Sequence, residues 1–262
     1  MGLALEVRPA ISELWMRTLL RSLPFEIRTF VDVGANIGQS LLSYKSVCPE
    51  GRYVGFEPNP FCVVYVHELA SESAIRNFEI VPAGLSDEPR VASLHVGRRN
   101  LTNSGATLET DLKDVARKVA HPVCLYRLDD ISDEFGFEKG GLVLKIDAES
   151  HESKVFRGAS SFIGALQPLI IAEVLPPRDS NDVGRMENIS EINALLESLQ
   201  YEIYKISITP DRDLSVLQKI DYIPAEPVSK ELKEFNRDYV FAPKSLHSEL
   251  LKIKLARSGE SG

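Results

Sequence analysis

The sequence predicts an α/β fold in which a mostly parallel sheet carries helices on both faces. Short apolar runs rich in β-branched residues predict strands at residues 28–33, 52–57, 78–81, 142–147 and 169–174. Between several of these runs the apolar residues recur at helical spacing, which predicts helices at residues 38–47, 62–69 and 190–199. The continuous apolar run that begins at Leu142 suits a strand covered on both faces.

The length of 262 residues and the hydrophobic content of 44% allow a substantial core, and we expect a single domain over residues 1–262. It should consist of a helical extension (1–27), a Rossmann-like core (28–243), and a C-terminal helix with a frayed tail (244–262). The first helix, at about residues 10–22, is amphipathic. Its apolar face is expected to pack on its own domain or on a partner in a homodimer, rather than on a lipid surface.

The middle of the chain departs from simple alternation of strand and helix. Residues 91–96 predict an extra strand, residues 100–105 are turn-rich, and residues 123–128 are again extended. We expect an insertion near the ligand face of the sheet, followed by a short helix at residues 129–131.

The C-terminal part completes the predicted sheet. Strands are expected at residues 201–206 and 239–242, after a helix at residues 190–199 for which Ser190 is the expected N-cap. From about residue 256 the chain contains only small and charged residues, and we expect it to be frayed.

Composition excludes several classes of protein. With 30 basic and 38 acidic residues the formal charge is −8, which argues against a nucleic-acid partner. The three cysteines form no CxxC pair, as expected for reduced thiols in the cytoplasm. No segment reaches the roughly 18 consecutive apolar residues of a membrane-spanning helix, and the N-terminus does not resemble a signal peptide. We therefore expect a cytoplasmic protein.

A glycine turn follows the first predicted strand. Gly34 ends the apolar run and Gly38 opens a helical pattern, and such glycines either adopt positive φ or let a ligand approach the backbone. The second strand ends at Glu57, 19 residues after Gly38. In a nucleotide-binding βαβ unit, an acid at this place hydrogen-bonds the ribose hydroxyls. The unit is therefore predicted to hold an adenosine group.

Acidic residues gather at the ends of the predicted strands. Asp32, Glu57, Asp147 and Glu173 each lie at or beside a strand end, and Asp87 follows the third strand after a short loop. Ligands of open α/β sheets bind outside the carboxyl ends of the strands. These acids are therefore expected to surround one crevice, suited to a ligand that carries hydroxyls, amines or positive charge.

Residues 145–152 are the densest group of functional side chains. After Asp147, we expect Glu149, His151 and Glu152 to face the crevice from the loop and helix start. The helix dipole also favours acids in a first turn, but His151 has no such structural explanation, and neighbouring acids would raise its pKa and orient it as a general base. Asp147, Glu149 and His151 also suit a divalent cation, although we expect no metal.

Residues 32–38, with the sequence DVGANIG, resemble the cofactor-binding motif of the FkbM-type methyltransferases, a branch of the class I S-adenosylmethionine-dependent enzymes. Residues 55–60 resemble the family's ribose-binding strand end, and residues 83–87 its third-strand loop. Later blocks follow in the family's usual order at residues 103–108, 128–130, 144–149 and 171–174. The chain departs from the pattern at Ser150, where the family commonly has glycine.

The resemblance implies a class I sheet of seven strands, with the last strand antiparallel, and transfer of a methyl group from S-adenosylmethionine, usually to an oxygen. We therefore expect O-methylation of a small metabolite, sugar or glycan. Glu57 would take the ribose diol, residues 84–87 would flank adenine, and Asp32 would lie near the amino-acid end. The residues assigned to the cofactor are Asp32, Gly34, Ala35, Asn36, Gly38, Glu57, Pro58, Asn59, Gly84, Leu85, Ser86 and Asp147.

The resemblance also directs attention to a base, because an alcohol must lose its proton when it is methylated. His151 is the first candidate, with Asp147 or Glu149 orienting it or replacing it. Residues 88–127 and 175–235 are expected to shape the acceptor pocket.

Two other functions are compatible with parts of the sequence. A nicotinamide-dependent oxidoreductase would also use a glycine turn and a distal acid, but Gly34 and Gly38 have GxxxG spacing and the GxGxxG pattern is missing. A non-catalytic nucleotide-binding protein could keep the same fold, and Ser150 is the best argument for it.

Overall fold

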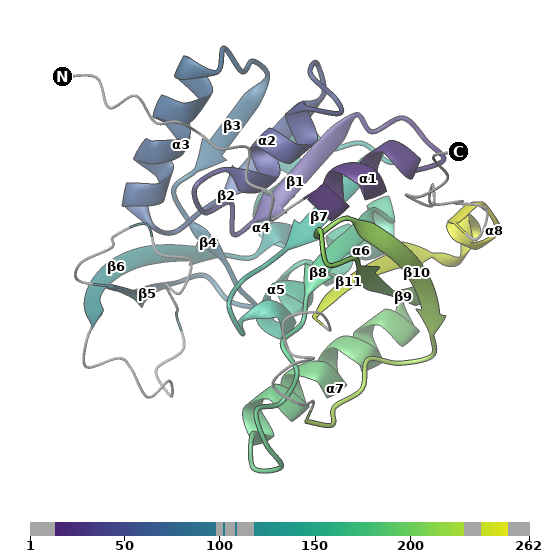
Figure 1. Ribbon diagram of the computed structural model, residues 1–262. Helices are drawn as coiled ribbons and strands as arrows, with labels where there is room; N and C mark the ends of the chain where they lie inside the picture. Colours follow the sequence, from purple (N-terminus) through teal and green to yellow (C-terminus); the bar gives the residue numbers. More distant parts are fainter. Residues whose placement is uncertain (1–13, 98–101, 103–107, 109–117, 228–236, 251–262) are drawn as a thin grey trace.

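The computed structural model describes residues 14–97, 102, 108, 118–227 and 237–250. An eight-stranded sheet runs through its centre in the order β10-β9-β11-β8-β7-β1-β2-β3 (Figure 1). These strands are β1 (Thr29–Val33), β2 (Arg52–Phe56), β3 (Phe78–Val81), β7 (Leu142–Ile146), β8 (Leu169–Glu173), β9 (Tyr201–Ile208), β10 (Leu214–Ile220) and β11 (Asp238–Pro243).

Strand direction in this sheet agrees with the expected class I pattern. Strands β3, β2, β1, β7 and β8 pair in parallel. The last strand of the chain, β11, lies between β8 and β9 and is antiparallel to both. The prediction of a mostly parallel sheet with an antiparallel last strand is thus confirmed. Strand β10, which extends the edge of the sheet antiparallel to β9, was not predicted. Most of its residues are partly or fully exposed, so its sequence lacks the apolar pattern of a core strand.

Both faces of the sheet are covered, as predicted. Neighbouring residues Phe30 and Val31 of β1 are fully buried in two different clusters, one on each face. The face of Phe30 is covered by α1 (Leu14–Ser22), α2 (Gln39–Lys45), α3 (Pro60–Glu72) and α8 (His247–Leu250). The face of Val31 is covered by α4 (Leu128–Ile131), α5 (Glu152–Gly158), α6 (Ser160–Leu166) and α7 (Val183–Ser198). Two short 3₁₀ helices, η3 (Ser132–Phe135) and η5 (Lys244–Leu246), follow α4 and β11.

Helix α1 uses its apolar face within its own chain. Trp15, Met16, Leu19 and Leu20 are buried in the cluster on the face of Phe30. Of the two expectations for this helix, packing on its own domain is therefore confirmed. Among the described residues, no helix combines the length and the apolar character needed to cross a membrane.

The predicted insertion forms a second sheet of three strands, in the order β4-β6-β5 (Figure 1). Its strands are β4 (Gly84–Leu85), β5 (Arg90–Gly97) and β6 (Lys118–Tyr126). Strands β5 and β6 pair antiparallel along the whole of β5. The ring of His121 in β6 meets Phe61 of α3 edge-on at 5.6 Å, which joins this sheet to the main body. The predicted turn at residues 100–105 lies, apart from Thr102, outside the described residues.

The predicted start of the helix at residues 190–199 was wrong. Helix α7 begins at Val183 after Asp182, so Ser190 lies inside the helix and is not its N-cap. Ile189 is buried and extends the apolar face toward the N-terminus. The first two turns of α7 are mostly polar, so hydrophobic periodicity alone did not predict them.

Candidate cofactor-binding and catalytic site

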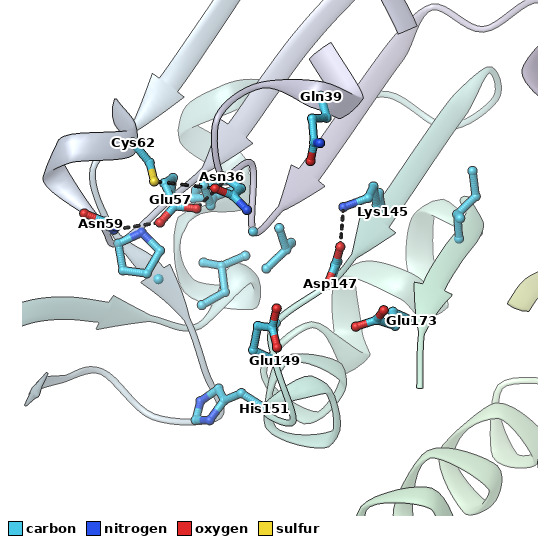
Figure 2. Close-up of a pocket in the computed structure, with 18 of the residues that line it drawn as sticks. Asn36, Gln39, Glu57, Asn59, Cys62, Lys145, Asp147, Glu149, His151 and Glu173 are labelled. Carbon is cyan, nitrogen blue, oxygen red and sulfur yellow. Dashed lines mark hydrogen bonds and ion pairs between the residues drawn. The ribbon is translucent and has the colours of Figure 1, made fainter. Parts of the chain in front are cut away.

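A cavity of about 410 Å³ lies at the carboxyl ends of the parallel strands. Its lining comes from both ends of the chain, from Trp15 to Asp238. Figure 2 shows Asn36, Glu57 and Asn59 at one side of it and Lys145, Asp147 and Glu173 at the other. Its volume and position agree with those of ligand sites in open α/β sheets.

The glycine turn after β1 packs tightly on the end of β7. Gly34 has φ of 87°, and its N–H donates to the carbonyl of Phe56 at 2.9 Å. A Cβ atom at Gly34 would lie 1.9 Å from the carbonyl oxygen of Asp147. Gly38, with φ of 84°, precedes the first residue of α2. The turn therefore needs glycine both for its backbone conformation and for its approach to β7.

Glu57 joins the turn after β1 to the turn after β2. Its Oε2 accepts the N–H of Asn36 and its Oε1 accepts the N–H of Asn59, both at 2.7 Å. Asn59 in turn caps α3 through the N–H of Phe61. Burial raises the pKa of Glu57 from its ordinary value of 4.5 to about 7, although the two N–H groups oppose the rise. The carboxyl group is thus held at one position in the cavity wall.

The cavity wall beside Glu57 is apolar. It is formed by Phe56, Leu85, Leu94 and Leu108, which come from four separate segments. At Gly84, which also lines the cavity, a Cβ atom would lie 2.7 Å from Leu125 Cδ2. Leu94 and Leu108 were not named individually, although both lie in residues 88–127, which were expected to shape the acceptor pocket. Of the two, only Leu94 could have been singled out from the sequence, because it belongs to a strand in which alternate residues are buried.

An ion-paired cluster joins the cavity wall to the buried ends of β1 and β7. Lys145 Nζ is 3.3 Å from Asp32 Oδ1 and 3.2 Å from Asp147 Oδ2. Asp32 is fully buried and accepts a hydrogen bond from the Tyr53 hydroxyl at 2.6 Å. Asp32 therefore supports the cavity from behind, through Lys145, which the sequence prediction left out of the site.

The turn after β7 has an unusual backbone. Glu149 and Ser150 both have positive φ, at 51° and 76°. The Glu152 carboxylate accepts the N–H groups of Ala148 and Ser150 through Oε1, at 3.2 and 3.0 Å, and is fully buried. The expectation that Glu152 faces the crevice is thus wrong: it closes its own loop. Burial raises its pKa to about 7.

Ser150→Gly is expected to stabilise the protein by about 0.5–1 kcal/mol. The left-handed region costs an L-residue about 1–2 kcal/mol, and part of the gain is offset by the greater entropy of glycine in the unfolded chain. Urea denaturation would measure the change. Ser150→Ala is the matched control, because it keeps the Cβ atom at φ of 76° and should bring no gain. A loss of stability in Ser150→Gly would contradict this explanation.

His151 lies at the β4 side of the cavity. It is 1% exposed, and its Nε2 is 3.0 Å from Ser86 Oγ. Ser86 also bonds Asp87, whose carboxylate pairs with Arg157 at 2.7 Å. Figure 2 shows the imidazole pointing away from Lys145 and Asp147. The role of His151 as a base stays a prediction, and its contacts tie it to the loop after β4.

Glu173, expected as one of the strand-end acids around the crevice, lies at the opposite end of the cavity. It pairs with Arg237 at 2.9 Å between Oε1 and Nε. Asp238 lies beside Glu173 on the antiparallel strand β11. Burial raises the pKa of Asp238 to about 6. Trp15 and Arg212 complete this end.

The cavity thus brings together most of the residues predicted for the cofactor and all three predicted for catalysis. Those that line it are Gly34, Asn36, Glu57, Pro58, Asn59, Gly84, Leu85, Asp147, Glu149 and His151. The other predicted residues, Asp32, Ala35, Gly38 and Ser86, lie outside the lining. Within the described part of the chain, no three His, Cys, Asp or Glu residues are arranged to hold a metal ion.

The strand order, the glycine turn after β1 and the acid after β2 are those of the class I methyltransferase fold. Residues 32–203 match the model of the methyltransferase FkbM domain. Because the match spans well over half of the chain, the chain belongs to the FkbM methyltransferase family.

Two named proteins are similar to this chain in sequence. The chain is 28% identical over 198 residues to the methyltransferase sdnD of Sordaria araneosa, covering 66% of this chain and 73% of that protein. It is 29% identical over 252 residues to the AMB antimetabolite synthetase AmbE of Pseudomonas aeruginosa, covering 78% of this chain and 12% of the synthetase. The crystal structure of the methyltransferase FkbM from Methylobacillus flagellatus has the same fold, with a TM-score of 0.53 and 18% identity over 88% of this chain and 47% of that one.

The cofactor is S-adenosylmethionine, and the residues present fit it. A carboxylate has about four acceptor sites, so Glu57 can accept two ribose hydroxyls besides the two N–H groups that hold it. The apolar wall of Phe56, Leu85 and Leu94 suits a purine ring. The acids at the other end of the cavity suit the positive charges of the sulfonium and ammonium groups.

Proposed function

We propose that the protein transfers a methyl group to a hydroxyl oxygen of a small metabolite, sugar or glycan. The observation that supports this choice is a group of carboxyl side chains, Asp147, Glu149 and Glu173, in the same cavity as Glu57. When bound, S-adenosylmethionine supplies an electrophilic methyl group. A hydroxyl acceptor must lose its proton, and carboxylates at the cavity wall can receive it.

The chain's own residues would act mainly by binding and positioning. Glu57, with the backbone of Gly34 and Asn36, would hold the ribose, and Leu85 would flank the adenine. Asp147, fixed by Lys145, would lie near the charged end of the cofactor. Correct alignment of the reacting atoms contributes on the order of 7–11 kcal/mol in favourable cases.

A binding and turnover experiment tests the proposal. Calorimetry with S-adenosylmethionine, S-adenosylhomocysteine and NAD should show binding of the two sulfur nucleotides and none of NAD. A panel of sugars and other alcohols, with matched amines and thiols, would then be analysed by mass spectrometry for a mass gain of one methyl group. Binding of NAD alone would contradict methyl transfer, and methylation confined to amines or thiols would contradict the choice of oxygen.

His151→Ala separates two roles for the histidine. As the base it would lower turnover by about 10²–10⁴-fold with unchanged affinity for S-adenosylhomocysteine. The other role is to hold the loop after β4 against the cofactor, and the hydrogen bond from His151 to Ser86, the neighbour of Leu85, favours it. We therefore expect weaker cofactor binding, with turnover at saturating cofactor reduced by less than tenfold. Ser86→Ala, which removes the same hydrogen bond, should reproduce this pattern. Large loss of turnover with intact binding would restore His151 as the base.

A further inference from the structure

We propose that Glu173 is the residue that takes the proton from the acceptor hydroxyl. This inference rests on the proposed O-methylation and names the base for it. Glu173 is the last residue of β8, it lines the cavity, and its side chain is 12% exposed. Figure 2 shows its carboxyl group directed toward Asp147 and Glu149, at the end of the cavity opposite to Glu57.

Three other ionisable groups of the cavity are engaged or are more exposed than Glu173. The Asp147 side chain pairs with Lys145 through Oδ2 and is 35% exposed, against 12% for Glu173, and His151 bonds Ser86. Both oxygens of Glu57 hold backbone N–H groups. Among the described residues, Glu173 pairs with Arg237 through Oε1, so Oε2 remains for an acceptor.

The surroundings of Glu173 strengthen it as a proton acceptor. Burial is the main cause that raises its pKa, to about 9, followed by the negative charge of Asp147, directly after the neighbouring strand β7. Asp238 on β11 and Glu149 after β7 act in the same direction, whereas Arg237 opposes them. Arg185 of α7 also interacts electrostatically with Glu173. A carboxyl group in such surroundings binds a proton more tightly than a free glutamate does.

The step balances in atoms and charge. The acceptor O–H bond breaks and its proton passes to the Glu173 carboxylate, while the acceptor oxygen forms the bond to the methyl carbon. The electron pair of the carbon–sulfur bond stays on sulfur. One cation and one anion are consumed, and an ether, a thioether and a neutral carboxylic acid result.

Glu173→Gln tests the assignment. Turnover at saturating cofactor should fall by about 10²–10⁴-fold, with the affinity for S-adenosylhomocysteine changed less than threefold. Turnover of the wild type should rise with pH toward the pKa of Glu173, and the variant should lose this rise. Glu197→Gln, the same change at an exposed position of α7, is the matched control and should behave as the wild type. A Glu173→Gln variant with wild-type turnover and an unchanged pH profile would overturn the inference while leaving O-methylation intact.

Asp238→Asn gives an independent kinetic check. It removes a negative charge beside Glu173, so the rise of turnover should move to lower pH. A rise that stays at the same pH, or moves to higher pH, would contradict the assignment of that rise to Glu173. If the wild type methylates only amines or thiols, the proposed O-methylation fails, and this inference fails with it.

Stability without cofactor supplies a readout other than activity. A glutamate whose pKa is higher in the folded than in the unfolded state binds more protons when folded, so stability falls as pH rises between the two values. For Glu173 this window runs from about 4.5 to about 9. Above about pH 8, where Glu57, Glu152 and Asp238 have largely titrated, the melting temperature of Glu173→Gln should fall less steeply than that of the wild type. Equal slopes between about pH 8 and 9 would overturn the inference.

Discussion

Glu57→Ala should weaken the binding of S-adenosylhomocysteine by more than about 100-fold. Hydrogen bonds to a charged group contribute about 1.5–3 kcal/mol each, and the variant would lose two ribose contacts, which together exceed the roughly 2.8 kcal/mol of a 100-fold change. The substitution also releases the N–H groups of Asn36 and Asn59 that the carboxylate holds. Titration calorimetry would measure the affinity.

Glutamine is not a conservative replacement at this position. Both oxygens of Glu57 accept N–H groups, and glutamine would turn its own NH₂ group toward one of them. We therefore expect Glu57→Gln to bind nearly as poorly as Glu57→Ala. Glu79→Ala, at an exposed acid of β3, is the control and should bind normally. Normal affinity in a folded Glu57→Ala variant would remove the ribose assignment.

The pKa of Glu57 adds a pH test to the same measurement. Ribose hydroxyls donate to the ionised carboxylate, so binding favours the deprotonated form. With a pKa of about 7 in the free protein, wild-type affinity should rise between pH 6 and 8. The rise should be smaller in Glu57→Ala.

Gly34→Ala should lower the free energy of unfolding by about 3 kcal/mol or more. Alanine at φ of 87° is strained by about 1–3 kcal/mol, and its Cβ would overlap the Asp147 carbonyl oxygen at 1.9 Å. Backbone atoms form the contact, so it can be relieved only by separating the turn after β1 from the end of β7. That movement would also displace Asn36 and Asp147 in the cavity wall. Urea denaturation and cofactor titration would measure the two effects.

Gly184→Ala is a matched control for this substitution. Gly184 lies in the first turn of α7, with no atom within 4 Å of the added Cβ and no positive φ. Alanine is the better helix former there, so this variant should gain about 0.5 kcal/mol and keep its affinity. Gly34→Ala with wild-type stability would show that the turn can move without cost.

Much of the cofactor end of the site could be predicted from sequence because its residues are close to one another in the chain. Gly34, Gly38 and Glu57 belong to one strand–turn–helix–strand unit whose geometry is nearly fixed by its length. The same logic placed Asp147 and Glu173 at one edge of the sheet. Where parallel strands end at the same edge of a sheet, the spacing of residues along the chain is sufficient to predict which of them meet at the site.

The other end of the cavity depends on contacts between distant segments. Because β11 is antiparallel, it reaches the cavity with its first residue, Asp238, whereas the parallel strands reach it with their last residues. A search for acids at the carboxyl ends of strands therefore could not find Asp238. Trp15 and Arg212 meet through a backbone hydrogen bond of 3.1 Å across most of the chain. Glu152 looked like a cavity acid because sequence order does not show that a side chain turns back to its own loop.

The residues that line the cavity come both from the span shared with the family domain and from segments outside it, among them Trp15 and Arg212. The span shared with the FkbM domain, residues 32–203, supplies the glycine turn, Glu57 and the wall from β7 and β8. Trp15, Arg212, Arg237 and Asp238 come from outside that span. The span shared with the family domain and the segments on either side of it thus build one cavity. Exchanging these flanking segments between family members would then be a route to altered acceptor preference in chimeric enzymes.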